Sequence, residues 1–355
     1  MNETTLHLLI YIMAFLIPPS TLESQPFSPL HSPPLQNRMT PGDVGILKST
    51  LLPSFGIYAS LSLGTYLAAE ATDRVELKDW LWPSAQVLNA WWIAVGRPMH
   101  MHDLPFSTVW GAQSWTEKVL LSCVTIWGTR LFFRIAARSL SRGKDDSRYD
   151  AVKKEPGFWK RAFGTIFLPE ALVLTIISLP FTAPLTIGNT TLALGEDALN
   201  AIRALGVGLF GIGFGLEVLA DTQLELHRRE RTDLCRHGVW SLVRHPNYLG
   251  DTLVHFSFTV LNMAGMWNPI VLLGPIMNYI FLRLVGGDKQ TEASQLERYK
   301  SGDPLKYDQL VQWRKENNSF WPALRELASP WAFTALGCGF ISVVVEEGLR
   351  GSFEL

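Results

Sequence analysis

The sequence predicts an all-α fold, a polytopic transmembrane helical bundle of about 7–9 spans. Hydrophobic residues make up 47% of the 355 residues and charged residues only 18%, against roughly 25% charged in an average soluble protein. The apolar residues are also gathered into long blocks, and a spanning helix needs about 20 of them in a row. Together, composition and block length indicate an integral membrane protein.

The apolar blocks define the expected elements in chain order. Seven of them approach the length of a span, at residues 51–69, 80–95, 119–137, 163–182, 198–220, 249–267 and 269–285. A shorter block at 331–345 is a last span or an interfacial helix. The opening block, 6–17, is a poor signal peptide because no Lys or Arg precedes it, so it is interpreted as an uncleaved segment.

These blocks give three regions. Residues 1–46 form an N-terminal hydrophobic segment followed by a Pro- and Ser-rich linker. Residues 47–327 form a transmembrane domain, whose half at about 127–322 carries the sequence motifs described below. Residues 328–355 form a C-terminal hydrophobic helix and tail.

Loop charge gives the orientation. The segments 138–161, 222–247 and 286–325 are rich in Lys and Arg, whereas 183–197 and the turn at 267–269 have none. Because cytoplasmic loops carry the excess of Lys and Arg, the basic segments are placed in the cytosol. The chain as a whole has 31 basic and 32 acidic residues, so no nucleic-acid partner is expected.

The cysteines exclude two further classes of protein. Cys123, Cys235 and Cys338 lie far apart in the chain, which argues against a disulfide framework and against a thiolate zinc cluster. No metal site is therefore predicted.

Ionisable residues inside the apolar blocks are the functional candidates, because a charge in the bilayer is costly and normally faces a cavity. One helical stripe holds Glu217, Asp221, Glu225 and Arg228. A second holds Asn247, Asp251, His255 and Asn262, with Pro246 at the favoured first helical position. A third set is Arg130, Arg134 and Arg138. Arginines suit phosphates and carboxylates suit ribose hydroxyls, so the pattern favours a nucleotide cofactor that enters from the cytosol.

The segment from Leu234 to Asp251 reads L-C-R-H-G-V-W-S-L-V-R-H-P-N-Y-L-G-D. It resembles the signature of the steroid 5-alpha-reductase C-terminal-like superfamily, which includes sterol reductases. The nearest resemblance is to the poorly characterised bacterial and fungal branch. Further marks of that superfamily are Arg130, Arg134, Gly143, Asp145, Arg148 and Tyr149, then Glu217, Asp221 and Gln223, then Glu292, Tyr307, Trp313 and Pro322.

The resemblance implies an NADPH site and hydride transfer to a carbon–carbon double bond. Its cofactor-contacting positions fall on Asn247, Tyr248 and Asp251, beside Arg244 and His245 of the signature. Glu217, Asp221 and Arg228 are expected to form the opposing wall, and Arg130, Arg134 and Arg148 to hold phosphates. The sequence does not identify the proton donor, and Tyr149 and His255 are the candidate catalytic residues. Residues 129–134 lack the Tyr of animal steroid reductases, which favours the same cofactor with a different lipophilic substrate.

Two other classes stay open. Isoprenylcysteine and phospholipid methyltransferases, which use S-adenosylmethionine, share the H-G, R-H-P and Y-x-G parts of the signature. A non-catalytic membrane scaffold or lipid-binding protein is the second alternative. The favoured interpretation is an NADPH-dependent reductase of the endoplasmic reticulum membrane. It reduces a sterol-, terpenoid- or polyketide-like substrate that arrives through the lipid bilayer, with the cofactor site facing the cytosol.

Overall fold

The computed structural model describes residues 44–186, 192, 194–265 and 267–353. Every regular element within these ranges is helical, which confirms the predicted all-α class. The block at 6–17 and nearly all of the predicted N-terminal region lie outside the described residues. The chain divides into two compact units, Met1–Thr190 and Thr191–Leu355, called unit 1 and unit 2 below. The division predicted from the sequence follows motifs rather than packing and stays a prediction.

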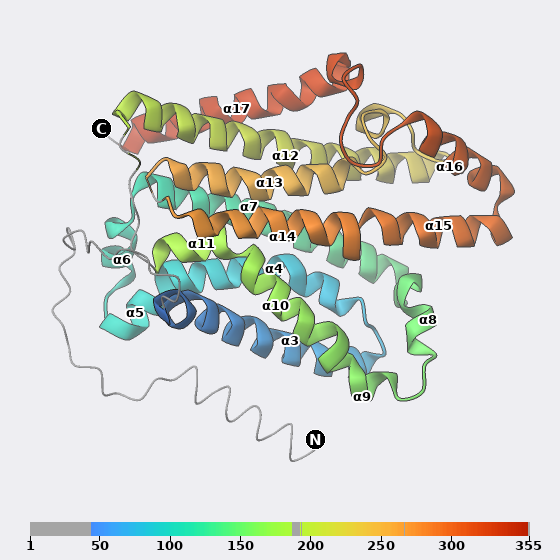
Figure 1. Cartoon of the computed structure of the whole chain (residues 1–355), viewed down its shortest axis with the longest axis horizontal. Helices are drawn as coiled ribbons and strands as arrows, with labels where there is room; N and C mark the ends of the chain where they lie inside the picture. Colours follow the sequence, from blue (N-terminus) through green and yellow to red (C-terminus); the bar gives the residue numbers. More distant parts are fainter. Residues whose placement is uncertain (1–43, 187–191, 193, 266, 354–355) are drawn as a thin grey trace. The chain divides into compact units, whose positions relative to one another are not determined.

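Unit 1 contains four principal helices. They are α3 (Leu52–Thr72), α4 (Leu77–Trp91), α7 (Trp115–Arg142) and α10 (Leu168–Ile177). Short helices connect them: α2 (Val44–Ile46), α5 (Arg97–His102), α6 (Phe106–Ala112), α8 (Asp150–Lys153), α9 (Phe158–Ala162) and α11 (Leu179–Thr182). Helix α4 packs against α3 and α7, and α10 packs against α3 (Figure 1).

Local sequence explains where α7 begins and ends. The Ser114 hydroxyl accepts a hydrogen bond from the Glu117 amide, and the Glu117 carboxylate accepts one from the Ser114 amide at 2.6 Å, which is a capping box. Gly143 ends the helix with a φ of +68°, a conformation that glycine adopts without strain. Close to the middle of α7, Gly128 lets α4 approach, because a Cβ there would lie 3.1 Å from the Pro83 carbonyl oxygen.

Unit 2 is built from α12 (Glu196–Glu230), α13 (Pro246–Met263), α14 (Leu273–Ile280), α15 (Asp288–Gly302), α16 (Pro304–Glu316) and α17 (Pro330–Phe353). The 35-residue α12 is its axis, and α13 and α17 lie along it (Figure 1). Small residues make this packing close. A Cβ on Gly213 would lie 2.6 Å from the Gly250 carbonyl oxygen, and one on Gly211 would lie 2.7 Å from the Cys338 carbonyl oxygen.

Five described helical segments are long and apolar enough to cross a membrane: Leu47–Thr72, Trp115–Arg142, Glu196–Glu230, Pro269–Gly302 and Pro330–Ser352. Two consecutive helical segments, Phe158–Ile177 and Leu179–Leu185, are bent by 55° relative to each other. If this pair is counted as one span, the described residues hold six candidate spans. The predicted 7–9 spans also included blocks 80–95 and 249–267. These fall on α4, which is only 15 residues long, and on α13, which carries a stripe of polar side chains.

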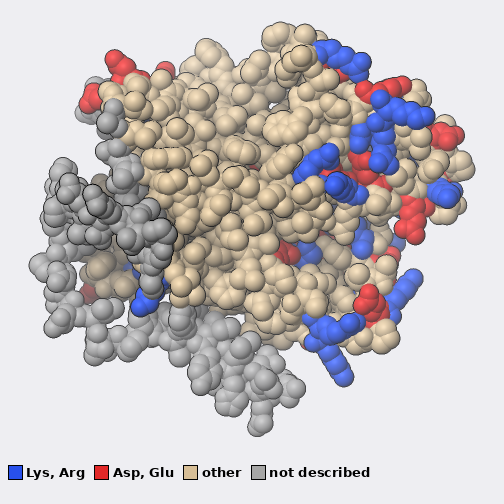
Figure 2. Space-filling view, viewed as in Figure 1, with Lys and Arg blue, Asp and Glu red and all other residues tan. Residues whose placement is uncertain are grey.

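The surface agrees with a membrane protein. Figure 2 shows broad surfaces without charge along the long helices, and on unit 2 the charged side chains gather over α15 and α16. Helix α17 exposes Phe333, Phe340 and Ile341, each more than 60% accessible. A stripe of this kind is favourable against lipid and costly in water.

Candidate active site

Near the start of the signature, Gly238 lies in a turn whose backbone conformation favours glycine. Gly238 has a φ of +70°, and a Cβ there would lie 2.0 Å from Gln223 Oε1. That oxygen accepts the Val239 amide at 2.9 Å. The turn therefore fastens the signature to α12, and the H-G dipeptide of the motif has a structural role.

The middle of the signature is part of the core of unit 2. Val239 and Val243 are fully buried, and Trp240 is 8% exposed. The Trp240 indole donates to the Ala220 carbonyl at 3.0 Å. These side chains pack with Leu249 of α13 and Trp313 of α16, so the residues that follow are held on a rigid base.

Arg244 and His245 face a buried carboxylate. Arg244 donates to Glu292 of α15 through Nε at 2.8 Å and through Nη2 at 3.2 Å. His245 Nε2 lies 3.0 Å from Glu292 Oε1, and Arg314 Nε lies 3.1 Å from Oε2. Burial lowers the pKa of His245, although Glu292 acts in the opposite direction. Two residues predicted to bind cofactor thus lie in a network that fixes the signature to α15.

The backbone of the same residues is also held. The Arg244 amide donates to Asn318 and the His245 amide to Ser319, each at 3.0 Å. His245 is the N-cap of α13 and Pro246 follows it in the first turn, as predicted. The start of α13 is therefore fixed from both its side chains and its main chain.

Asn247 and Tyr248 lie half-buried in that first turn. The Asn247 side-chain oxygen is buried and has no hydrogen-bond partner. Tyr248 stacks on His245, with ring centroids 5.3 Å apart, and its hydroxyl lies 3.2 Å from Thr291 Oγ1. Among the described residues this buried acceptor thus has no donor, which is costly.

Asp251 and His255 lie one and two turns further along α13. Asp251 is 7% exposed and accepts the Asn278 amide of α14 at 3.0 Å. His255 is fully buried, and its Nδ1 lies 3.0 Å from the Asp251 carbonyl oxygen. Asn278 supplies a contact that the sequence pattern did not single out.

The acidic stripe of α12 runs from interior to surface. Glu217 is 2% exposed, Asp221 and Glu225 are half-buried, and Arg228 is exposed. Each of the four has a polar or electrostatic partner. Glu217 lies against the signature, because a Cβ on Gly250 would lie 2.9 Å from its Cγ. The structure thus places Glu217 beside α13.

The remaining candidates belong to unit 1. Arg148 Nη2 donates to Asp79 Oδ2 at 2.6 Å, and the Tyr149 hydroxyl donates to Asp79 Oδ1 at 3.0 Å. Burial raises the pKa of Tyr149, and the Asp79 carboxylate raises it further. Lys78 completes the cluster by bonding to Glu170 at 2.9 Å. Sequence reasoning missed Lys78 and Asp79, which directly precede the predicted apolar block at 80–95.

Arg130 and Arg134 lie half-buried on α7, and neither is without a partner. Arg130, Arg134, Arg148 and Tyr149 thus belong to unit 1. The other nine candidates, Glu217, Asp221, Arg228, Arg244, His245, Asn247, Tyr248, Asp251 and His255, belong to unit 2. The structure brings together the α13 candidates and Glu217, and the phosphate-binding role of the unit 1 arginines stays a prediction.

One further cluster was not expected. His227, Cys235 and His237 each offer a ligand atom, and these atoms lie within 4.8 Å of one another. The expectation of no metal site did not consider the histidines on either side of Cys235. The H-x7-C-x-H spacing of this segment was the signal that would have found the cluster.

Fold and site together define a polytopic helical membrane protein with a rigid polar site at the start of α13. The sequence matches the DUF1295 family, described as proteins of unknown function, over residues 65–312, and the chain belongs to this family, which is steroid 5-alpha-reductase-like. The match begins well before residue 127, where the resemblance was first evident.

Similarity to a curated protein is narrower. The chain is 34% identical over 77 residues to a Delta(14)-sterol reductase of Arabidopsis thaliana. The match covers 22% of this chain and 20% of that protein, so it concerns only a fifth of the relative's length. No solved structure matches the chain at the significance threshold.

Proposed function

We propose that this protein is a membrane reductase that uses NADPH to reduce a carbon–carbon double bond in a lipophilic substrate. The observation that carries the proposal is the first turn of α13. There a buried Asn247 oxygen without a partner follows two residues that are fixed to Glu292. The family match and the short similarity to a sterol reductase support the same class of activity.

The residues of this turn fit a nicotinamide. The first amides of a helix have no intrahelical acceptor and carry partial positive charge. A carboxamide both donates and accepts, so it would suit the Asn247 oxygen together with these amides. Asp251 and Tyr248 would hold the ribose end, with Glu217, Asp221 and Arg228 opposite. NADPH, when bound, supplies a hydride.

The chain's own groups would supply the proton. Tyr149 and His255 are the candidate acids, since each carries a hydrogen that a reduced alkene can take up. The lipophilic substrate would reach the helices from the bilayer. We place the protein in the endoplasmic reticulum membrane, with the cofactor site on the cytosolic side that the basic segments predict.

The first experiment compares ligands. NADPH, NADH and S-adenosylmethionine are added separately to the detergent-purified protein, and thermal unfolding is followed. A ligand that binds only the folded state stabilises it by about 2.7 kcal/mol at one hundred times its Kd. Stabilisation by NADPH alone supports the reductase. Stabilisation by S-adenosylmethionine alone supports the methyltransferase, and no stabilisation by any of the three favours a non-catalytic scaffold.

Replacing Asn247 tests the site itself. Asn247→Ala removes the unpaired acceptor, so we expect the stabilisation by NADPH to be lost while unfolding without ligand changes little. Asn200→Ala is the matched control, because Asn200 lies at the other end of α12, where its side-chain oxygen accepts a hydrogen bond from Arg350 at 3.4 Å. Wild-type affinity for NADPH in Asn247→Ala would refute the cofactor assignment.

A further inference from the structure

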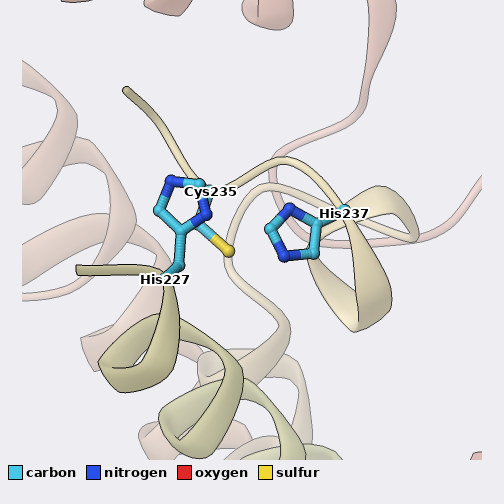
Figure 3. Close-up of side chains that lie close together, drawn as sticks. All are labelled: His227, Cys235 and His237. Carbon is cyan, nitrogen blue, oxygen red and sulfur yellow. The ribbon is translucent and has the colours of Figure 1, made fainter. Parts of the chain in front are cut away.

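The segment between α12 and the signature folds back so that three metal-ligating side chains meet. His227 is in the last turn of α12, and Cys235 and His237 follow after a short loop. Figure 3 shows the Cys235 sulfur directed into the space between the two imidazole rings, whose centroids are 5.0 Å apart. None of the three has a part in the proposed reductase site.

His227 is oriented as a metal ligand would be. Its Nε2 lies 3.0 Å from the Asp233 carbonyl oxygen and 3.1 Å from the Asp233 carboxylate. Nε2 therefore carries the hydrogen, and Nδ1 carries the lone pair. The side chain is 2% exposed, and Nδ1 is buried with no hydrogen-bond partner among the residues that the structure describes. In Figure 3 this nitrogen is on the side of the ring that faces the Cys235 sulfur.

The contacts between His227 and Asp233 are those that a metal-binding histidine usually makes through the nitrogen that does not bind the metal. A histidine that binds a metal through one nitrogen almost always donates its other N–H to a carboxylate or a carbonyl, and Asp233 offers both. Without a metal, the buried Nδ1 of His227 is an acceptor that nothing satisfies, which is costly. The same atom with a metal bound is fully satisfied.

The other two side chains complete a set with distinct properties. Cys235 is 5% exposed, and burial raises the pKa of its thiol. His237 is exposed and lies on the rim of a surface pocket of about 400 Å³ that Arg236 and Trp313 also line. An ion can therefore reach the His237 ligand from water.

We propose that His227 Nδ1, the Cys235 thiolate and a His237 nitrogen bind one Zn²⁺ ion, with water in the fourth position. One sulfur and two imidazoles form a donor set typical of zinc. Zn–N bonds of about 2.0 Å and Zn–S bonds of about 2.3 Å place tetrahedral ligands roughly 3.3–3.5 Å apart. Since the three atoms lie within 4.8 Å of one another, the widest pair would have to close by up to about 1.5 Å, a movement open to the exposed His237.

Binding has two consequences. The thiol loses its proton to water as the zinc–sulfur bond forms, so affinity rises with pH. The ion would also connect the end of α12 to the residue before Gly238, and would thereby stabilise the turn that begins the signature. This role is independent of the proposed reductase activity.

Cobalt provides the test. The full-length protein in detergent is treated with a chelator, dialysed and titrated with Co²⁺, which takes the zinc geometry and gives a visible spectrum. We expect one Co²⁺ per chain, tetrahedral absorption bands, a thiolate-to-cobalt charge-transfer band, and displacement by Zn²⁺. Octahedral spectra, or no saturable binding, would overturn the proposal.

Variants identify the ligands. Cys235→Ser should abolish the charge-transfer band and weaken binding at least about 100-fold, and His237→Ala should weaken it more than about tenfold. Cys338→Ser, which changes a half-buried thiol of α17, is the control and should bind as wild type. Because His237 is exposed, His237→Ala should fold normally. A Co²⁺ spectrum unchanged in both ligand variants would refute the site, whatever the response to NADPH.

Discussion

The guanidinium group of Arg244 is hydrogen-bonded to other groups of the protein. Two of its nitrogens bond to Glu292, and Nη1 donates to the Asn317 carbonyl. A buried carboxylate that loses a partner is strongly destabilising. We therefore predict that Arg244, the arginine of the R-H-P-N-Y motif, acts by positioning the start of α13, and that His245 does the same.

Replacing Arg244 by lysine keeps the charge but removes the planar fork. We expect Arg244→Lys to lower the free energy of unfolding by about 1.5–3 kcal/mol, the range for hydrogen bonds to charged groups. Thermal unfolding in detergent measures it. Arg314→Lys is the control, because Arg314 meets Glu292 through one nitrogen and its side chain is 44% exposed. Equal losses in the two variants would contradict the positioning role.

Acid should weaken unit 1 through Asp146. This carboxylate pairs with Arg142 at 2.7 Å and Arg148 at 3.2 Å. Burial alone would raise the pKa of Asp146. The positive charges of Arg148 and Arg142 have the larger, opposite effect and lower this pKa to about 2. The unfolded chain therefore takes up the proton first, and the stabilisation present above about pH 4 is lost as the pH falls through about 2.

Asp146→Asn should accordingly lower the free energy of unfolding by about 2 kcal/mol at neutral pH. The difference from wild type should shrink as the pH is lowered to about 3. Denaturation in detergent at the two pH values measures it, with the exposed Asp150→Asn as control. A difference that stays constant with pH would show that Asp146 acts through something other than its charge.

At the scale of elements, α12 and α13 approach closely at two glycines. The Gly213 and Gly250 carbonyl oxygens would each lie within 2.6 Å of a Cβ added to the other residue. Since backbone atoms are on both sides, no side chain can move aside to make room. The glycine of the Y-x-G motif thus fixes how α13 lies on α12.

Gly213→Ala should be destabilising by about 1–3 kcal/mol, the cost of overpacking, despite the better helix propensity of alanine. Gly208→Ala is the matched control in the same helix, because its Cβ would meet Val343 at an ordinary 3.5 Å. That variant should be neutral or stabilising. Thermal unfolding compares the two, and equal effects would refute the close approach.

The sequence predicted the helices better than their contacts. Long apolar blocks located the principal helices, and Pro246 marked the start of α13, because these signals are local. The sequence did not indicate that Glu292 binds both Arg244 and His245, or that Asp79 binds Tyr149. Such partners lie 47 to 70 residues apart in sequence, and no periodicity links them. The count of spans differed because polar stripes lower the hydropathy of α13.

For the whole molecule, the orientation can be measured. We introduce Ser301→Cys in the last turn of α15, in a basic segment, and Ser107→Cys in α6, on the opposite predicted side. Both positions are exposed, whereas Cys123 and Cys235 are buried. In sealed microsomes, a membrane-impermeant maleimide should label Ser301→Cys at once and Ser107→Cys only after permeabilisation. The reverse pattern would invert the predicted topology.

The length of α12 has a consequence for where this protein can work. Its 35 residues rise about 52 Å, whereas the hydrocarbon layer is about 30 Å thick. Glu217 lies 13 residues from the end of the helix, or about 20 Å, and so falls close to the membrane boundary. In a thicker bilayer this carboxylate would lie within the hydrocarbon layer, whereas in a thinner bilayer it would lie outside that layer. Membrane thickness therefore acts directly on the acidic stripe.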